Sequence, residues 1–312
     1  MRRVMVDTDP GIDDTMAILF ALRSPEVCVE GLTTVFGNVG VEQTTRNSLK
    51  VLEIADRCDI PVAQGAAKPL LRPYRGKGSR VHGANGLGEV ELSPPKSEPV
   101  SIRAVELILS RVMETPGEIT LIAIGPLTNL ALAVSVEPRL AENVREVIIM
   151  GGAVTIPGNA SPVAEANIYN DPEAAKIVFH AGWPLTMVGL DVTTKTTMTP
   201  DYLAKIKAAR TPITDFISAI TPFYLNYYRT QLGLDKIYVH DPSAMAYAID
   251  PSLFQTEKVY IDVEIGEGRS SGQTIADLSG LGNEPANVNL CLDVDAPRLL
   301  ALYLERITSV SE

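Results

Sequence analysis

Four aspartates lie within eight residues near the N-terminus, in the segment VDTDPGIDD: Asp7, Asp9, Asp13 and Asp14. Carboxylates packed this closely raise one another's pKa unless a cation or hydrogen bonds compensate. No Lys or Arg occurs between Arg3 and Arg23, so the neighbouring chain does not supply that cation. Clusters of carboxylate oxygens suit Ca²⁺ or Mg²⁺. The segment therefore predicts a site for a hard metal ion.

A simpler interpretation places Asp13 and Asp14 in the first turn of a helix, where the macrodipole favours negative charge. It leaves Asp7 and Asp9 unexplained, because both precede the turn at Pro10 and Gly11. We therefore favour the metal site over first-turn acids alone.

Known acidic motifs can be tested against this segment by spacing. An EF-hand loop counted from Asp7 would need glycine at Ile12 and glutamate at Ile18, so it is excluded. A Mg²⁺-dependent phosphatase of the haloacid dehalogenase type stays open, because it also begins with a strand followed by Asp-x-Asp, here Asp7-Thr8-Asp9. The following PGIDD departs from that pattern, and no downstream acidic pair stands out. Glycine motifs typical of dinucleotide or P-loop nucleotide sites are absent from the sequence.

Further candidates for acid–base chemistry lie far along the chain. The segment YVHDP brings His240 and Asp241 together before a helix, and VHGANGLG places His82 in a Gly-rich stretch. Histidine changes charge near neutral pH and therefore suits proton transfer. His180 lies late in a helical segment, which is typical of a surface position.

Aromatic residues cluster just upstream of His240, at Phe223, Tyr224, Tyr227 and Tyr228. Tyr224 and Tyr228 share one helix face because they are four residues apart. They either pack in the core or frame a planar ligand, and their concentration slightly favours the second reading.

The elements that must position these residues alternate between strand and helix. Strands are expected at 4–6, 27–38, 59–65, 119–124, 144–152 and 184–191, with helices at 15–23, 44–57, 127–134 and 170–181 between them. In the last third we expect a helix at 214–231, an antiparallel pair at 257–266 and 272–279, and a strand at 287–295 before a final helix. Residues 71–95 read as a long loop.

This alternation predicts an α/β fold with an open, mostly parallel central sheet and helices on both faces. We expect one domain over residues 1–312, because no repeat or linker interrupts the chain. Ligands of such sheets bind outside the carboxyl ends of the strands. Asp7, Asp9, Asn38, Ile124 and the pair Gly151 and Gly152 fall at or just after predicted strand ends, so we expect them at one edge of the sheet.

The amino-acid composition indicates which kinds of binding partner and which cellular location are compatible with the chain. The formal net charge of −11 disfavours a nucleic-acid polymer but is compatible with a small neutral substrate and a bound cation. No apolar run is long enough for a membrane span, and the N-terminus does not read as a signal peptide, so we expect a cytoplasmic protein. Cys28, Cys58 and Cys291 lie far apart and are expected to be reduced core residues.

Taken together, the motifs resemble the inosine–uridine-preferring nucleoside hydrolases. The segment DTDPGIDD after a first strand is similar to the signature of that family. Seven further blocks resemble the family in the same order: TTVFGNV, HGANGLG, IGPLTNLALA, IMGGAV, GNASPVAEANIYNDPEAA, MVGLDVT and VHDPSAMAY. The resemblance implies a Rossmann-like fold and hydrolysis of the N-glycosidic bond of ribonucleosides to free base and ribose.

The family resemblance also implies a role for each matching residue. Ca²⁺ would be held by Asp9, Asp14, Asp241 and the backbone carbonyl of Ile124, with Asp9 also acting as the base that takes a proton from a Ca²⁺-bound water. The ribose would be held by Asp13, Asn38, Asn159, Glu165, Asn167 and the backbone near Met150. Tyr224 and Tyr228 would frame the base, His240 would protonate it as it leaves, and His82 would be a second active-site histidine. A homodimer or homotetramer is expected.

Two other classes remain open on the sequence. One is the Mg²⁺-dependent phosphatase built on Asp7 and Asp9, for which we find no cationic phosphate pocket. The other is a non-catalytic nucleoside-binding protein that retains the metal cage, which the presence of both Asp9 and His240 disfavours.

Overall fold

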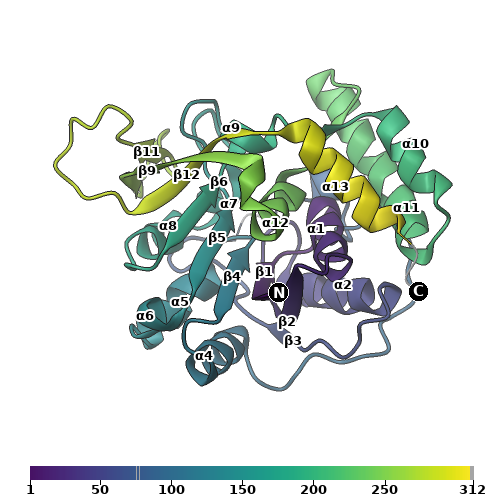
Figure 1. The fold of residues 1–312 in the computed structure, drawn as a ribbon, viewed down its shortest axis with the longest axis horizontal. Coiled ribbons are helices and arrows are strands. Elements are labelled where there is room, and N and C mark those ends of the chain that lie inside the picture. Colours follow the sequence, from purple (N-terminus) through teal and green to yellow (C-terminus); the bar gives the residue numbers. More distant parts are fainter. Residues whose placement is uncertain (75, 77, 310–312) are drawn as a thin grey trace.

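A computed structural model describes residues 1–74, 76 and 78–309 and has a central sheet of eight strands between two layers of helices (Figure 1). In spatial order the strands are β3 (Val62–Gln64), β2 (Val27–Thr34), β1 (Arg2–Thr8), β4 (Ile119–Ala123), β5 (Glu146–Met150), β6 (Leu185–Val188), β12 (Val288–Val294) and β9 (Phe254–Val259). The first seven are parallel, and β9 is antiparallel to β12 at the edge. The predicted mostly parallel α/β sheet is confirmed.

Strand side chains alternate between two hydrophobic cores, as the pleat of a sheet requires. In β1, Val4 and Val6 belong to one core and Met5 to the other. The first core is closed by α1 (Ile12–Leu22), α2 (Val41–Ile54), α10 (Pro200–Ala208), α11 (Pro212–Tyr227), α12 (His240–Ile249) and α13 (Ala296–Thr308). The second is closed by α4 (Ala104–Glu114), α5 (Thr128–Val136), α6 (Leu140–Asn143) and α8 (Pro172–Phe179). Both faces of the sheet are therefore buried, which explains its continuous apolar strands.

Short elements connect these layers. They are α3 (Ser79–His82), α7 (Ala166–Asn170), α9 (Leu190–Thr193), a π-helical turn at Tyr228–Leu232 and a 3₁₀ turn at Pro251–Leu253. Two small antiparallel pairs join β7 (Thr197–Met198) to β8 (Ile237–Tyr238) and β10 (Ile261–Val263) to β11 (Thr274–Ala276). In the described part of the chain, no helix combines the length and apolar character that crossing a membrane requires.

The strand order reverses between β1 and β4, since the chain builds outward from β1 in both directions. In open α/β sheets such a switch point leaves a crevice at the carboxyl ends of the two strands. Asp9 follows β1, and Ile124 follows β4. The fold therefore places the aspartate segment beside the crevice.

The structure differs from the sequence prediction in the last third of the chain. Residues 257–266 do not form one strand, because β9 ends at Val259 and β10 begins at Ile261. β9 joins the central sheet, whereas β10 pairs with β11 as expected. The alternation of Val259, Ile261 and Val263 continues through the break, so the local pattern does not reveal it. Helices α4 and α10 were also missed, and the expected loop 71–95 contains the short helix α3.

The three cysteines are free thiols at different depths. Cys291 is buried, as expected, but Cys28 is only partly buried and Cys58 is exposed. The prediction of core positions was therefore wrong for Cys58.

Candidate active site

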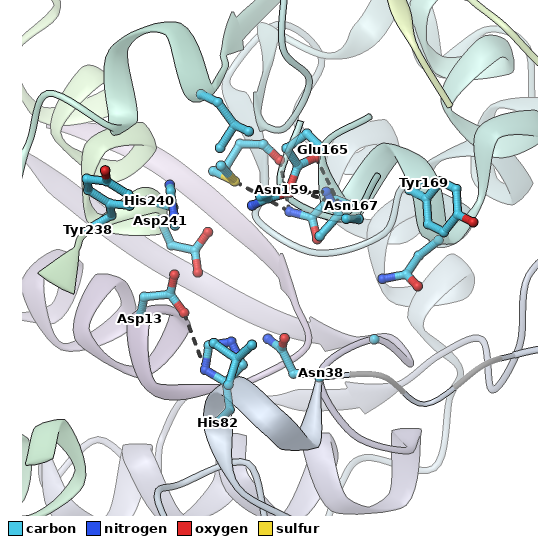
Figure 2. Close-up of a pocket in the computed structure, with 18 of the residues that line it drawn as sticks. Asp13, Asn38, His82, Asn159, Glu165, Asn167, Tyr169, Tyr238, His240 and Asp241 are labelled. Carbon is cyan, nitrogen blue, oxygen red and sulfur yellow. Dashed lines mark hydrogen bonds and ion pairs between the residues drawn. The ribbon is translucent and has the colours of Figure 1, made fainter. Parts of the chain in front are cut away.

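A cavity of about 800 Å³ opens at the carboxyl edge of the sheet (Figure 2). The start of α1, the loops after β2 and β4, the end of β5 and the start of α12 all contribute to its lining. Thirteen of the fourteen predicted site residues line it: Asp13, Asp14, Asn38, His82, Ile124, Met150, Asn159, Glu165, Asn167, Tyr224, Tyr228, His240 and Asp241. The exception is Asp9, which is not among the lining residues.

Asp14 organises the turn between β1 and α1. One carboxylate oxygen accepts hydrogen bonds from the Thr8 hydroxyl at 2.7 Å and the Asp9 backbone N–H at 3.2 Å. The other accepts from the Gly11 backbone N–H and the Asn38 side-chain amide, both at 3.0 Å. These contacts fix the direction in which the DPGIDD segment leaves the strand.

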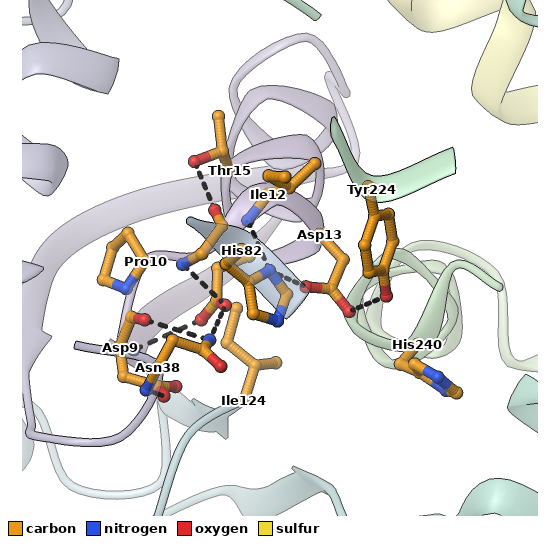
Figure 3. A network of polar contacts seen from close by, with 12 residues as sticks. Asp9, Pro10, Ile12, Asp13, Thr15, Asn38, His82, Ile124, Tyr224 and His240 are labelled. Carbon is orange, nitrogen blue, oxygen red and sulfur yellow. Dashed lines mark hydrogen bonds and ion pairs between the residues drawn. The ribbon is translucent and has the colours of Figure 1, made fainter. Parts of the chain in front are cut away.

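Asp9 lies in a narrow space between two glycines. Its Oδ2 accepts a 2.6 Å hydrogen bond from the Asn38 backbone N–H, while its buried Oδ1 has no partner in the described part of the chain (Figure 3). A Cβ atom at Gly37 or at Gly125 would overlap this carboxylate. Both turns therefore require glycine, and an unsatisfied oxygen is left available at the edge of the sheet.

Asp13, Asp14 and Asp241 form a close acidic group among the described residues. One ligand oxygen of each lies within 4.8 Å of the others, and all three side chains are buried. Asp241 reaches the group from the first turn of α12 and accepts no hydrogen bond from any described residue. The group could hold a metal ion. It includes Asp13, which was expected to hold the ribose, and does not include Asp9, which was expected as a ligand.

Burial and mutual repulsion make these carboxylates hard to ionise without a cation. Desolvation, then repulsion by neighbouring acids, raises the pKa of Asp9 and of Asp241 well above the ordinary value. Desolvation raises the pKa of Asp13 to about 6 and also raises that of Asp14. No Lys or Arg of the described chain bonds to any of the four. A bound cation would therefore stabilise the ionised cluster.

The two histidines that line the cavity lie at opposite ends of a row of tyrosine rings. His82 accepts a 3.1 Å hydrogen bond at Nδ1 from the backbone N–H of Ile12, and its ring stacks on Tyr224 at 5.3 Å. Its Nδ1 is also 3.7 Å from Asp13 Oδ1, but this is not an ion pair, because that nitrogen is already an acceptor. Desolvation lowers the pKa of His82, and likewise that of His240, to about 4.

Hydroxyl groups link His240 to the acidic cluster. The Tyr224 hydroxyl donates to Asp13 at 3.2 Å and lies 3.2 Å from the Tyr228 hydroxyl, which in turn is 3.4 Å from His240 Nε2. At the other ring nitrogen, the hydroxyl of Thr193 lies 2.7 Å from His240 Nδ1. The two tyrosines therefore face the cavity and the site rather than serving only as core packing.

The opposite wall is built from amides and one buried acid. Asn167 donates to the backbone carbonyls of Ile124 at 3.0 Å and Met150 at 3.1 Å, so the two strand ends are joined at the cavity. Glu165 accepts backbone N–H groups from Gly152, Asn167 and Ile168, and desolvation raises its pKa to about 7. The side-chain oxygen of Asn159 accepts the backbone N–H of Ala166.

Some residues of the site were not predicted from the sequence. Thr8 and Thr193 contribute hydroxyls to Asp14 and His240, and Tyr238 lines the cavity with its ring 5.6 Å from that of His240. Thr193 lies shortly after β6, so the rule that ligands bind beyond strand ends could have found it. The predicted surface position of His180 is confirmed, since it is exposed and contacts Asp262 at 2.9 Å.

The phosphatase alternative fails on the position of Asp7. This carboxylate is buried and does not line the cavity, and its Oδ1 accepts hydrogen bonds from Thr33 and Asn129. It is therefore a structural acid behind the sheet edge.

A doubly wound sheet with an acid-lined cavity at its switch point and histidines in the cavity wall is the architecture of an α/β protein that binds a small ligand at the carboxyl edge of the sheet. The sequence model of the inosine-uridine preferring nucleoside hydrolases matches residues 4–301. The chain belongs to this family, which confirms the predicted resemblance.

Similar proteins match the chain over nearly its whole length. The chain is 40% identical to a probable uridine nucleosidase of Arabidopsis thaliana over 98% of this chain and 97% of that protein. It is 38% identical to the inosine-uridine preferring nucleoside hydrolase of Leishmania major over 100% and 99% of the two chains. Among solved structures, a plant nucleoside hydrolase superposes with a TM-score of 0.95 at 39% identity, covering 99% of both chains. A purine-preferring ribonucleoside hydrolase from Gardnerella vaginalis gives a TM-score of 0.94 at 34% identity, covering 98% of both chains.

Proposed function

We infer that this nucleoside hydrolase cleaves the N-glycosidic bond of ribonucleosides with the help of one Ca²⁺ ion, giving free base and ribose. The observation that carries the inference is the cluster of Asp13, Asp14 and Asp241 beside the unsatisfied Oδ1 of Asp9. Four acids without a Lys or Arg partner suit a cation. The cavity beside them is large enough for a nucleoside, and family membership supports that substrate class.

The donor atoms fit Ca²⁺. Asp9, Asp14, Asp241 and the Ile124 carbonyl offer only oxygen, which hard cations prefer, and Ca²⁺ accepts the irregular shells of six to eight ligands that such loops provide. Asp13 lies close enough to hold either the ion or a sugar hydroxyl bound to it. When bound, the ion would supply positive charge that lowers the pKa of the attacking water and orients it.

Asp9 acts as the general base in this proposal. Its carboxylate is fixed by the Asn38 N–H and by the two flanking glycine turns, which leaves Oδ1 free to take a proton. The water oxygen forms a bond to the anomeric carbon, and its proton passes to Asp9 as the C–N bond breaks. Asp9 later releases that proton to solvent.

The ribose lies between the acidic cluster and the amide wall in this assignment. Asp13 and Asn38 hold the hydroxyls near the ion, while Asn159, Glu165 and Asn167 hold the far side of the sugar together with the backbone of Met150. Contacts that strengthen as the ring flattens stabilise a transition state that resembles an oxocarbenium ion.

His240 assists the departing base, which lies against Tyr224 and Tyr228. The base leaves with the electrons of the C–N bond, and the Nε2–H of the neutral His240 imidazole donates a hydrogen bond that stabilises the developing negative charge until the base takes a proton from solvent. In this proposal His82, which is fixed to the start of α1 by the Ile12 N–H, makes a second contact to the base.

Release of ribose from inosine and uridine tests the proposal. We expect release from both, lost after exhaustive chelation and restored by Ca²⁺. A protein that binds nucleosides without releasing ribose would be a non-catalytic binding protein. A protein that releases phosphate from a phosphomonoester instead would restore the phosphatase reading.

We further propose a homodimer or homotetramer and a cytoplasmic location, on the basis of the family resemblance and the sequence composition. Light scattering during size-exclusion chromatography tests the first, and fractionation of the source cells tests the second.

A further inference from the structure

One buried hydroxyl contacts His240 Nδ1, the ring nitrogen opposite the one that faces Tyr228. The Thr193 hydroxyl, at the end of α9, lies 2.7 Å from His240 Nδ1. Thr193 has no exposed surface, and in the described chain its hydroxyl has no other hydrogen-bond partner. The contact joins two segments that are 47 residues apart.

The isolation of this hydroxyl fixes the direction of the hydrogen bond. A neutral imidazole carries its proton on one nitrogen and accepts on the other. If Nδ1 carried the proton, Thr193 would have to accept, and its own buried hydrogen would then have no acceptor. Buried donors without partners are rare because they lose their bonds to water. Thr193 therefore donates to Nδ1, and the N–H of His240 lies on Nε2.

The groups on the other side of the ring require the same arrangement. Asp13, as a carboxylate, only accepts, so the Tyr224 hydroxyl donates to it. Tyr224 then accepts from Tyr228, and Tyr228 accepts from His240 Nε2–H. The four hydrogen bonds between Thr193 and Asp13 are therefore all donated in the same direction. Thr193 donates to His240 and His240 to Tyr228. Tyr228 then donates to Tyr224, and Tyr224 donates to Asp13.

We propose that Thr193 is a positioning residue that holds the His240 ring and keeps its N–H on Nε2, where it meets the departing base. The proposal rests on the role of His240 proposed above, but the tautomer itself can be observed independently of catalysis. A base entering the cavity would replace the long 3.4 Å contact to Tyr228 with a direct one. Without the Thr193 hydroxyl, the ring could turn or shift its N–H to Nδ1, away from the substrate.

Nitrogen NMR of the Ca²⁺-loaded enzyme labelled with ¹⁵N-histidine tests the tautomer directly. The wild-type spectrum should show a protonated Nε2 and an unprotonated Nδ1 for His240, whose signals are assigned by their loss in His240→Gln. A wild-type His240 with its proton on Nδ1 would overturn the proposal, and this measurement needs no Thr193 variant to fold.

Kinetics test the consequence with Thr193→Val, which removes the hydroxyl at nearly constant volume, and Thr193→Ser, which keeps it. On inosine, kcat of Thr193→Val should fall about tenfold with little change in KM, because one positioning hydrogen bond is lost. On p-nitrophenyl riboside, whose leaving group needs little assistance, the loss should be much smaller. Thr193→Ser should restore the wild-type ratio of the two activities and the wild-type tautomer.

Thr45→Val is the matched control, since it removes another buried threonine hydroxyl outside the cavity. It should leave the inosine-to-activated-substrate ratio unchanged. Equal losses of Thr193→Val on both substrates would show a merely structural role and overturn the proposal. If His240→Ala itself shows no dependence on the leaving group, the proposed role of His240 fails, while the NMR result still decides the tautomer.

Discussion

Asp9 and Asp13 are separated by only three residues, yet the structure gives them different surroundings. The Asp9 side chain packs between the turns that follow β2 and β4, and its Oδ1 has no hydrogen-bond partner among the described residues. Asp13 instead lines the cavity and accepts a hydrogen bond from the Tyr224 hydroxyl. The two residues are chemically identical, so the different roles that we propose for them follow from their different surroundings. Two substitutions test the proposed division of labour between water activation and departure of the base.

Asp9→Asn should nearly abolish turnover of inosine, uridine and p-nitrophenyl riboside alike, since water activation is common to all three. An amide can still accept from the Asn38 N–H but cannot take the proton, and general base catalysis is typically worth about 10²–10⁴-fold. Ca²⁺ content must be measured alongside, with the exposed Asp59→Asn as the control. Turnover within tenfold of wild type in a metal-loaded variant would remove Asp9 from the role of base.

His240→Ala should show a strong dependence on the leaving group. The loss on inosine should be about 10²–10⁴-fold, because the departing purine loses its hydrogen-bond donor, while the activated riboside should lose little. The exposed His180→Ala is the matched control and should behave as wild type. Similar losses on both substrates would indicate that His240 holds the sugar or the metal site instead.

At the scale of elements, the carboxyl ends of β1, β2 and β4 converge on one carboxylate. The turns after β2 and β4 approach Asp9 so closely that neither Gly37 nor Gly125 has room for a Cβ atom. The carboxyl ends of parallel strands lie at the same edge of the sheet. The turns that follow two strands can therefore pack against a side chain that follows the strand between them. Whether catalysis requires the Asp9 carboxylate in this fixed position can be tested by substitution of one of these glycines.

Gly125→Ala should displace the Asp9 carboxylate and lower kcat about 10²-fold, the typical result of misplacing a reacting group by about 1 Å. Overpacking should also destabilise the fold by about 1–3 kcal/mol. The kinetic loss should be the same for inosine and the activated riboside, because Asp9 serves both. Gly268→Ala, where a Cβ meets nothing within 4 Å, is the control. Wild-type kcat in Gly125→Ala would mean that the Asp9 position is adjustable.

For the whole molecule, the buried acids couple folding to pH and to the metal. Desolvation raises the pKa of Asp13 to about 6 and that of Asp7 and Glu165 to about 7, from ordinary values of 3.8 for aspartate and 4.5 for glutamate. A group whose pKa is raised by folding stabilises the protein below its unfolded pKa and loses that contribution as pH rises through the folded value. The metal-free protein should therefore lose stability between about pH 4 and pH 7.

Calcium should oppose this loss, because the ion favours the ionised acids and binds only the folded chain. At about 100 times the Kd it stabilises by about 2.7 kcal/mol, so Tm should rise on the order of 5 °C. The gain should be larger at pH 7.5 than at pH 5, since protonated carboxylates are poor ligands. Differential scanning calorimetry with and without chelator measures both effects. A Ca²⁺ gain that is independent of pH would separate the ion from the acidic cluster.

The sequence alone determined the parallel sheet and most of the site. Apolar strands that end in Asp, Asn or paired glycines are local patterns, and the topology of parallel sheets brings such ends to one edge. For that reason the residues Asp13, Asn38, Ile124 and Asp241 could be placed together although they span most of the chain.

Only the tertiary structure decided which atoms meet within that edge. The break at Tyr260, the free oxygen of Asp9 and the grouping of Asp13 with Asp241 depend on packing between distant segments. Thr193 reads as an ordinary threonine in sequence, and its hydroxyl gains importance only because α9 buries it against His240. Sequence patterns show the periodicity of apolar residues, and so they predict which face of a helix or strand is buried and which residues lie at the edge of the sheet. The direction of a single hydrogen bond depends on which partners burial leaves within reach, and those are set by the folded chain as a whole.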